Sequence, residues 1–105
     1  MIRLNILYPN TPGSRIDLDY YLGTHMPMAR RLFGDVLKEV TLEHGMAGVE
    51  PGLPPTYIMS CHMRFESIEA FMSAWATIGE QLGGDIPNYT DVAPVIQFSR
   101  IVPFD

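Results

Sequence analysis

Residues 17–33 read DLDYYLGTHMPMARRLF, and the rest of the chain is organised around this stretch. Apolar residues recur in it at helical spacing, which predicts an amphipathic helix with one face turned toward a core. Asp17 is a suitable N-cap and Gly34 fits the position after the last turn, so both ends of the helix are marked. The predicted apolar face consists of Leu18, Leu22, Ala29 and Leu32.

One position on that apolar face is ionisable. His25 falls between Leu22 and Ala29, and Tyr21 precedes it by one turn. Two residues later comes Pro27, which lacks an amide donor and whose ring collides with the carbonyl four residues earlier in a helix. We therefore expect the helical pattern to be interrupted at Pro27. A buried imidazole beside such a backbone defect is the strongest indication of a functional site in the sequence.

Four strands and a second helix complete the predicted order of elements. Alternating patterns predict strands at residues 2–9, 36–44, 57–65 and 95–102. The second helix begins after Ser67, its N-cap, and ends at Gly83-Gly84. Its apolar stripe consists of Ile68, Phe71, Trp75, Ile78 and Leu82. The order β-α-β-β-α-β predicts an α+β, ferredoxin-like fold, in which a four-stranded antiparallel sheet carries both helices on one face. At 105 residues the chain is expected to form a single domain.

The two faces of the predicted sheet differ in character. The face toward the helices receives Ile2, Leu4, Ile6, Tyr8, Met59, Met63 and Phe65. The opposite face is mixed, with Asn5, Thr41, Ser60 and Gln97 beside Leu7, Leu37, Ile58 and Ile101. Both a water-exposed face and a sheet-to-sheet interface tolerate that mixture, and alternation does not choose between them.

Two connecting segments have the composition of loops. Residues 45–55 hold three glycines and three prolines, which excludes a regular element. Such a loop is either a lid over a binding site or a tolerated surface excursion. Residues 85–91 have the Asp, Asn and Pro content of a structural turn.

Composition and motif content exclude several classes of function. The net charge is −5 and the largest basic cluster is Arg30-Arg31, so we expect no nucleic-acid partner. No apolar run approaches the roughly 20 residues of a membrane span. The single cysteine, Cys61, and the lack of a signal-peptide pattern suit a cytoplasmic protein. There is no HxH, HxxxH or CxxC spacing and no phosphate-binding glycine loop, so we expect neither a metal nor a nucleotide cofactor.

Two motifs resemble the EthD family. Residues 20–28, YYLGTHMPM, have that family's YY-x-x-x-H-x-P character, and residues 85–97, DIPNYTDVAPVIQ, match its second signature. The resemblance extends over nearly the whole chain. It implies a homodimeric α+β barrel, in which two protomers pack sheet to sheet and each keeps a small-molecule pocket between sheet and helices. EthD is named for an ethyl tert-butyl ether degradation gene cluster, where it accompanies an oxygenase system, and similar folds include cofactor-free monooxygenases, isomerases and polyketide cyclases.

His25 is the candidate catalytic residue. A neutral imidazole in an apolar pocket suits general acid/base chemistry, because burial disfavours the charged form. The alternative is a core histidine bonded to a nearby backbone carbonyl such as that of Gly23. The candidate ligand-binding residues are Tyr8, Tyr21, Met28, Met59, Trp75 and Tyr89. Each also suits ordinary core packing, which is the more frequent role of methionines and of aromatic residues on buried strand faces.

The leading hypothesis from sequence is a cofactor-independent enzyme acting on a small apolar compound, aromatic or polyketide-like. Isomerisation, cyclisation and oxygenation of an activated phenol all begin by removing a proton, so the residues do not separate these reactions. The rival hypothesis is a non-catalytic binding or accessory protein that sequesters a hydrophobic intermediate for an oxygenase degradation system.

Overall fold

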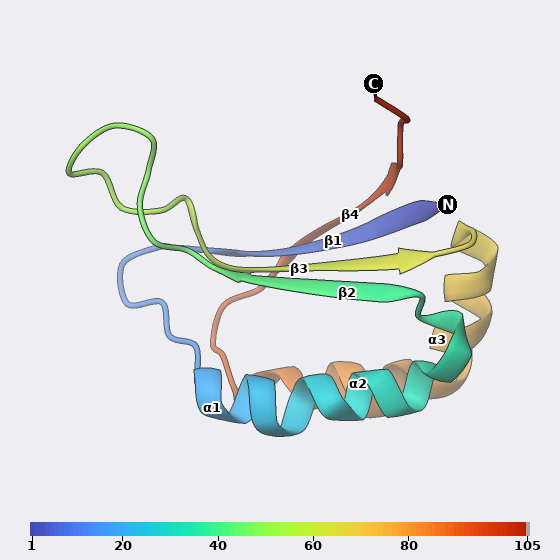
Figure 1. The fold of residues 1–105 in the computed structure, drawn as a ribbon. Coiled ribbons are helices and arrows are strands. Elements are labelled where there is room, and N and C mark those ends of the chain that lie inside the picture. The colour runs from blue at the N-terminus through green and yellow to red at the C-terminus, as the bar shows by residue number, and fades with distance from the viewer. Residues whose placement is uncertain (105) are drawn as a thin grey trace.

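Across residues 1–104, which the computed structural model describes, four antiparallel strands form one sheet with the helices on a single face (Figure 1). The strands are β1 (Ile2–Pro9), β2 (Glu39–His44), β3 (Tyr57–Phe65) and β4 (Val95–Arg100). Their spatial order is β2-β3-β1-β4, so the second and fourth strands lie at the edges. The predicted α+β, ferredoxin-like fold is therefore confirmed.

Strand alternation builds the core on the helix side of this sheet. Leu4 of β1 lies between Met63 of β3 and Phe98 of β4 in the strand register. All three project toward the helices, and Leu4 and Met63 are buried. On the opposite face Asn5 pairs with His62 of β3, and their side chains are hydrogen-bonded at 2.7 Å. The predicted division of β1 and β3 into an apolar and a mixed face is thus confirmed.

The first helix is wound differently from the predicted pattern. It runs through α1 (Leu18–Tyr20), a π turn (Tyr21–His25) and α2 (Met26–Phe33). In the π turn the Met26 N–H donates to the carbonyl of Tyr21, five residues earlier, which adds one residue to the turn. This added residue shifts the phase of the helix: Tyr21 and Met26 are buried, whereas Leu22 is 48% exposed. The expectation that Leu22 faces the core is therefore wrong.

The helix also continues through Pro27 instead of breaking there. Pro27 lies in the first turn of α2, directly after the π turn. A proline is least costly in the first turn of a helical segment, where its missing N–H has no helical partner to lose. The sequence located the irregularity correctly, but the chain resolves it by a wider turn rather than by an interruption.

The second strand starts later than the alternating pattern predicted. Gly34, at φ +59°, ends α2 and opens a 3-10 turn over Gly34–Val36, and β2 begins only at Glu39. Leu37 lies before the strand and does not follow its alternation. It is buried in the core at 6% exposure, so its assignment to the open face is wrong. The last strand likewise ends at Arg100 instead of residue 102.

The second helix, α3 (Ile68–Gly84), has the predicted boundaries and N-cap. The Ser67 hydroxyl accepts a hydrogen bond from the Ala70 N–H at 3.0 Å, which satisfies one of the free amides of the first turn. Ile68, in that first turn, is 42% exposed, so the apolar stripe reaches the core only from the second turn onward. The stripe positions that do so are Phe71, Trp75, Ile78 and Leu82.

The glycine- and proline-rich segment 45–55 forms a loop without regular secondary structure, as predicted. Figure 1 shows it extending past the end of the sheet, on the side away from the helices. Met46 and Val49 in it are almost fully exposed. Within residues 1–104 no helix has the length and apolar content that crossing a membrane requires.

Candidate functional site

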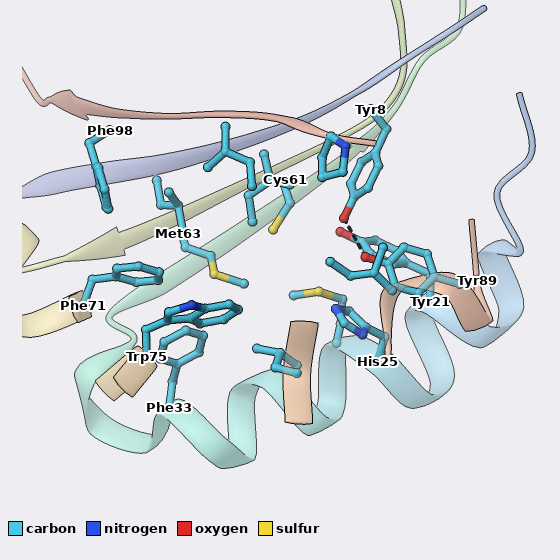
Figure 2. A pocket seen from close by; sticks show the side chains of 17 residues that line it. Tyr8, Tyr21, His25, Phe33, Cys61, Met63, Phe71, Trp75, Tyr89 and Phe98 are labelled. Atoms are coloured by element: carbon cyan, nitrogen blue, oxygen red, sulfur yellow. Dashed lines mark hydrogen bonds between the residues drawn. The ribbon is translucent and has the colours of Figure 1, made fainter. Parts of the chain in front are cut away.

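A cavity of about 240 Å³ lies between the sheet and the helices (Figure 2). Its wall is almost entirely apolar and aromatic, with polar atoms gathered at one end, where Tyr8, Tyr21, His25 and Tyr89 meet. The other end is formed by aromatic rings from α2, α3 and β4. These rings belong to Phe33, Phe71, Trp75 and Phe98. An apolar hollow with a few convergent polar groups is the usual form of a small-molecule site.

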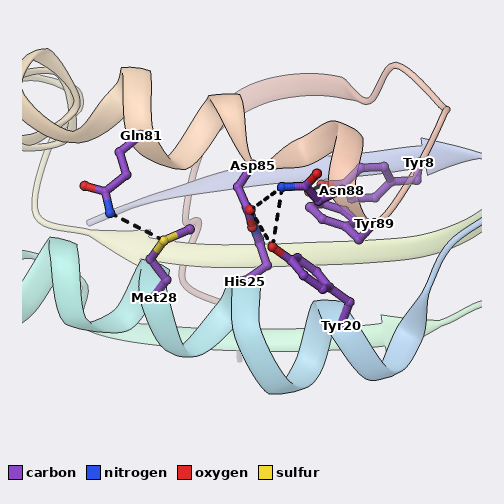
Figure 3. A network of polar contacts seen from close by, with 8 residues as sticks. All are labelled: Tyr8, Tyr20, His25, Met28, Gln81, Asp85, Asn88 and Tyr89. Atoms are coloured by element: carbon purple, nitrogen blue, oxygen red, sulfur yellow. Dashed lines mark hydrogen bonds and ion pairs between the residues drawn. The ribbon is translucent and has the colours of Figure 1, made fainter.

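The structure brings five of the seven sequence-predicted site residues together at this cavity. They are Tyr8, Tyr21, His25, Trp75 and Tyr89. Met28 and Met59 are not among the lining residues. Met28 instead lies between the helices, where its sulfur accepts a hydrogen bond from Gln81 Nε2 at 3.7 Å (Figure 3). Met59 is packed in the core beside the cavity. A methionine carries no directional signal in sequence, so which of several enters a cavity depends on the fold.

His25 has a charged partner that the sequence did not reveal. Its Nδ1 lies 2.9 Å from Oδ2 of Asp85, which caps the C-terminal end of α3 (Figure 3). The same carboxylate accepts a hydrogen bond from the Tyr20 hydroxyl at 2.6 Å and one from Asn88 Nδ2 at 2.9 Å. His25 is therefore not the core histidine bonded to a backbone carbonyl that the alternative interpretation required. It is oriented by a carboxylate that is itself held by two further donors.

A model of the EthD domain matches residues 17–93, a range that contains both His25 and Asp85. The chain belongs to the EthD family.

Solved structures of other EthD-type proteins agree with this assignment. An EthD-like protein from Ralstonia eutropha JMP134 is 41% identical, with a TM-score of 0.93 over 97% of this chain and 92% of that chain. An ethyl tert-butyl ether degradation (EthD) family protein from Bacillus halodurans C-125 is 20% identical, with a TM-score of 0.75 over 97% of this chain and 99% of that one.

A protein from Arabidopsis thaliana shares the fold at 12% identity, with a TM-score of 0.71 over 100% of this chain and 99% of that one. Comparison with curated protein sequences finds no significant match.

In this EthD-family chain the ionisation of the His25–Asp85 pair is set by burial and hydrogen bonding. Burial lowers the pKa of His25 below its ordinary value of 6.5, and the Asp85 carboxylate opposes that effect only in part. Burial raises the pKa of Asp85, but the hydrogen bonds from Tyr20, Asn88 and His25 outweigh it and hold that pKa below 3.8. Near neutral pH, Asp85 is therefore a carboxylate and His25 is neutral.

The neutral form of His25 has a defined tautomer. An ionised Asp85 can only accept hydrogen bonds, so Nδ1 of His25 must carry the ring proton and donate it. Nε2 then holds the free lone pair, and the side-chain hydrogen bond of His25 within residues 1–104 involves Nδ1 and not Nε2, which is therefore accessible and not fully enclosed. An imidazole oriented in this way is equipped to act as a general base toward a molecule in the cavity.

Three tyrosines complete the polar end of the EthD-family cavity. The ring of Tyr21 stacks on that of His25 with centroids 5.7 Å apart, and the ring of Tyr89 lies 4.5 Å from the imidazole. The hydroxyls of Tyr8 and Tyr89 are 2.6 Å apart. Burial raises the pKa of all three phenols, that of Tyr8 to about 12, so they remain protonated hydrogen-bond donors. Burial likewise raises the pKa of the neighbouring Cys61 thiol to about 11.

Proposed function

We propose that this protein is an acid/base enzyme that removes a proton from a small apolar compound held in the cavity. The observation that carries the proposal is the His25–Asp85 pair, whose free Nε2 belongs to a histidine that lines an otherwise apolar cavity. Structural histidines in a core use their nitrogens on nearby backbone or water. A neutral imidazole, fixed in one tautomer by a buried carboxylate, is the arrangement that general-base catalysis uses.

The reaction begins when Nε2 of His25 takes the acidic proton of the bound compound, from an activated C–H or a phenolic O–H. The electron pair of the broken bond moves onto the compound as an enolate or a phenolate, and His25 becomes an imidazolium. Asp85 stabilises that imidazolium through the existing 2.9 Å contact, which then joins two opposite charges. Return of the proton from His25 to another atom gives isomerisation. Attack by the new carbanion on a carbonyl carbon of the same molecule gives cyclisation, and the alkoxide so formed takes the proton back from His25.

We further propose, from the resemblance to EthD-like proteins, that the compound is aromatic or polyketide-like and that no organic cofactor takes part. Oxygenation of an activated phenol starts from the same anion, and oxygen consumption with turnover distinguishes it from isomerisation. The apolar wall of the cavity also suits an accessory protein that binds such a compound without converting it. Changing His25 separates the catalytic from the accessory role.

The test is hydrogen–deuterium exchange at the activated carbon of a small β-dicarbonyl compound in D₂O, followed by NMR. Exchange requires only removal and return of a proton, so the natural substrate need not be known. We expect His25→Asn to lower the enzyme-dependent exchange rate by about a hundredfold or more. His44→Asn is the matched control, because His44 is exposed at the end of β2 and does not line the cavity.

Two results contradict the catalytic proposal. One is that His25→Asn exchanges deuterium as fast as the wild type. The other is that the wild type gives no exchange above buffer while still binding the compounds, which favours the accessory role.

We also propose that the protein works as a homodimer, with a second copy packed against the open face of the sheet. The support is the resemblance to EthD-like proteins, together with the mixed character of that face. Leu7 and Ile58 lie on it half-buried within the single chain, beside hydrogen-bonded polar side chains such as His62 and Asn5.

A further inference from the structure

The hydroxyls of Tyr8 and Tyr89 at the polar end of the cavity carry two protons, but the hydrogen bond between them needs only one. Tyr8 Oη and Tyr89 Oη are 2.6 Å apart, and either can donate to the other. Two phenols carry two donor protons, and one hydrogen bond between them consumes one. Within residues 1–104 the Tyr89 hydroxyl has Tyr8 as its side-chain hydrogen-bond partner, and the Tyr21 hydroxyl is a second partner of Tyr8, toward which it acts as a donor that lowers the Tyr8 pKa. One O–H donor is therefore left over, next to an apolar cavity.

The surroundings of this pair favour an acceptor that carries negative charge. Tyr8 and Tyr89 are 2% and 0% exposed, so a hydrogen bond formed by their hydroxyls is shielded from water. The third phenol, Tyr21, lines the same end with its ring 4.8 Å from that of Tyr89 (Figure 2). These phenols and the Cys61 thiol stay neutral because burial raises their pKa values. The Asp85 carboxylate is the nearby negative charge, which also raises the pKa of Tyr89, and its oxygens are engaged by His25, Tyr20 and Asn88.

We infer that Tyr8 and Tyr89 form an oxyanion site that binds the oxygen of a phenolate or enolate as it forms in the cavity. A ligand oxygen that displaces the internal hydrogen bond accepts a hydrogen bond from the hydroxyl of each phenol. Hydrogen bonds to a charged oxygen are about twice as strong as those between neutral groups, so the exchange favours the anion over its neutral parent. The ring of Tyr89 lies against the imidazole at 4.5 Å, which brings this site and His25 within the reach of one small molecule.

The inference deepens the proposed function and rests on it for the source of the anion. It assigns the substrate class as a neutral carbon or oxygen acid whose conjugate base concentrates charge on one oxygen. Such a compound enters the apolar cavity uncharged and becomes an anion only beside donors already in place. Preorganised donors of this kind are worth about 10²–10³ in rate for each one removed in other enzymes.

The test measures binding alone, with 4-nitrophenol as the probe, because its phenolate absorbs light at longer wavelength than the neutral phenol. Spectra of the bound probe are recorded across a pH range that spans its own pKa. We expect the wild type to lower the pKa of bound 4-nitrophenol by about one unit or more. Tyr8→Phe and Tyr89→Phe are each expected to lose that shift and to bind the phenolate about tenfold more weakly.

Three controls keep the result specific. Tyr57→Phe removes a phenol that does not line the cavity, and it must behave as the wild type. Binding of 4-nitroanisole, which has no acidic proton, reports whether each variant keeps an intact cavity. In His25→Asn the probe's shift is expected to persist in part and to vanish when Tyr8→Phe is added. A shift that survives with His25 absent supports the oxyanion site even where the exchange experiment fails.

The inference is overturned if the wild type binds the neutral phenol at least as tightly as the phenolate, or binds no phenol at all. It is equally overturned if Tyr8→Phe and Tyr89→Phe, with 4-nitroanisole binding intact, shift the probe's pKa as far as the wild type does.

Discussion

At the scale of single residues, the candidate site is centred on His25, and the Asp85 carboxylate bonded to its Nδ1 affects both the tautomer and the pKa of the imidazole. A buried imidazole without a partner leaves polar nitrogens unsatisfied, which is costly in an apolar environment. Asp85 removes that cost at Nδ1 and leaves Nε2 free. Because Tyr20 and Asn88 also donate to Asp85, the carboxylate stays ionised although it is largely buried. In the proposed reaction Asp85 is thus a positioning residue that acts through His25.

Asp85→Asn tests that role through the pH dependence of exchange. The base must be neutral, so the rate is lost as the pH falls through the pKa of His25, which already lies below 6.5 in the wild type. The Asp85 charge raises that pKa, so its removal is expected to move the acid limb of the profile to still lower pH. The plateau rate should fall about a hundredfold, because an amide no longer dictates the tautomer.

Asp35→Asn, at an exposed site in the 3-10 turn after α2, is the matched control and should leave both features unchanged. An acid limb in Asp85→Asn that stays in place, or that moves to higher pH, contradicts the assigned role.

His25 could be found from the sequence, and Asp85 could not. An ionisable residue on an otherwise apolar helical face is visible as a break in a local pattern. Asp85 lies 60 residues further on, at the end of another helix. Aspartate is a common turn residue at such a position, so nothing in the local sequence indicates a contact with His25. Only the packing of α3 beside the first helix brings the two together. The family's second motif pointed to this segment, but not to the contact.

At the scale of elements, the boundaries that carry local chemical signals were predicted well. β3 spans the predicted residues 57–65, and α3 lies between its Ser67 cap and Gly84 as expected. The π turn was not predicted, because helix propensities do not distinguish it from a turn of an ordinary α-helix. The added residue changes only which side chains share a face of the helix. The exposure of Leu22 and the burial of Tyr21 both follow from that one added residue.

Two glycines within helices are expected to respond in opposite ways to alanine. A Cβ on Gly23, in the exposed part of the π turn, would meet no atom within 4 Å, so Gly23→Ala should stabilise the fold by about 0.5–1 kcal/mol. A Cβ on Gly79 would lie 2.7 Å from the Trp75 indole, which is stacked against Phe71. Gly79→Ala should destabilise the fold by about 1–3 kcal/mol through overpacking.

Urea unfolding followed by fluorescence measures both effects, since Trp75 is the single tryptophan of the sequence. The native emission spectrum should change in Gly79→Ala, where the indole must move, and stay as in the wild type in Gly23→Ala. Equal stability of the two variants would mean that the indole has room to shift at no cost.

At the scale of the whole molecule, the two faces of the sheet differ in what covers them. The helix-covered face holds the cavity and the His25–Asp85 pair, while the other face carries no helix among residues 1–104. Charged and amide side chains follow the open face, as in the Arg3–Glu39 ion pair at 4.0 Å and the Asn5–Ser99 hydrogen bond at 2.9 Å. Alternation predicted this mixture, but a periodic pattern cannot say what covers a face.

The proposed homodimer predicts that association depends on this open face and not on the helical one. Wild-type protein is expected to sediment as a dimer at micromolar concentration. Ser60 alternates with the buried residues of β3 and so projects from the open face, next to Leu7. Ser60→Arg places an unpaired charge at the centre of the proposed interface, where its desolvation is costly, and should shift the protein to monomer. The monomer should keep its fold, because that position borders no core of its own chain.

Thr77→Arg, exposed on α3, is the control: it adds the same charge on the helical side and should leave the dimer intact. Sedimentation of the wild type as a monomer, or a dimer that tolerates Ser60→Arg, would show that the two copies do not meet through the sheet.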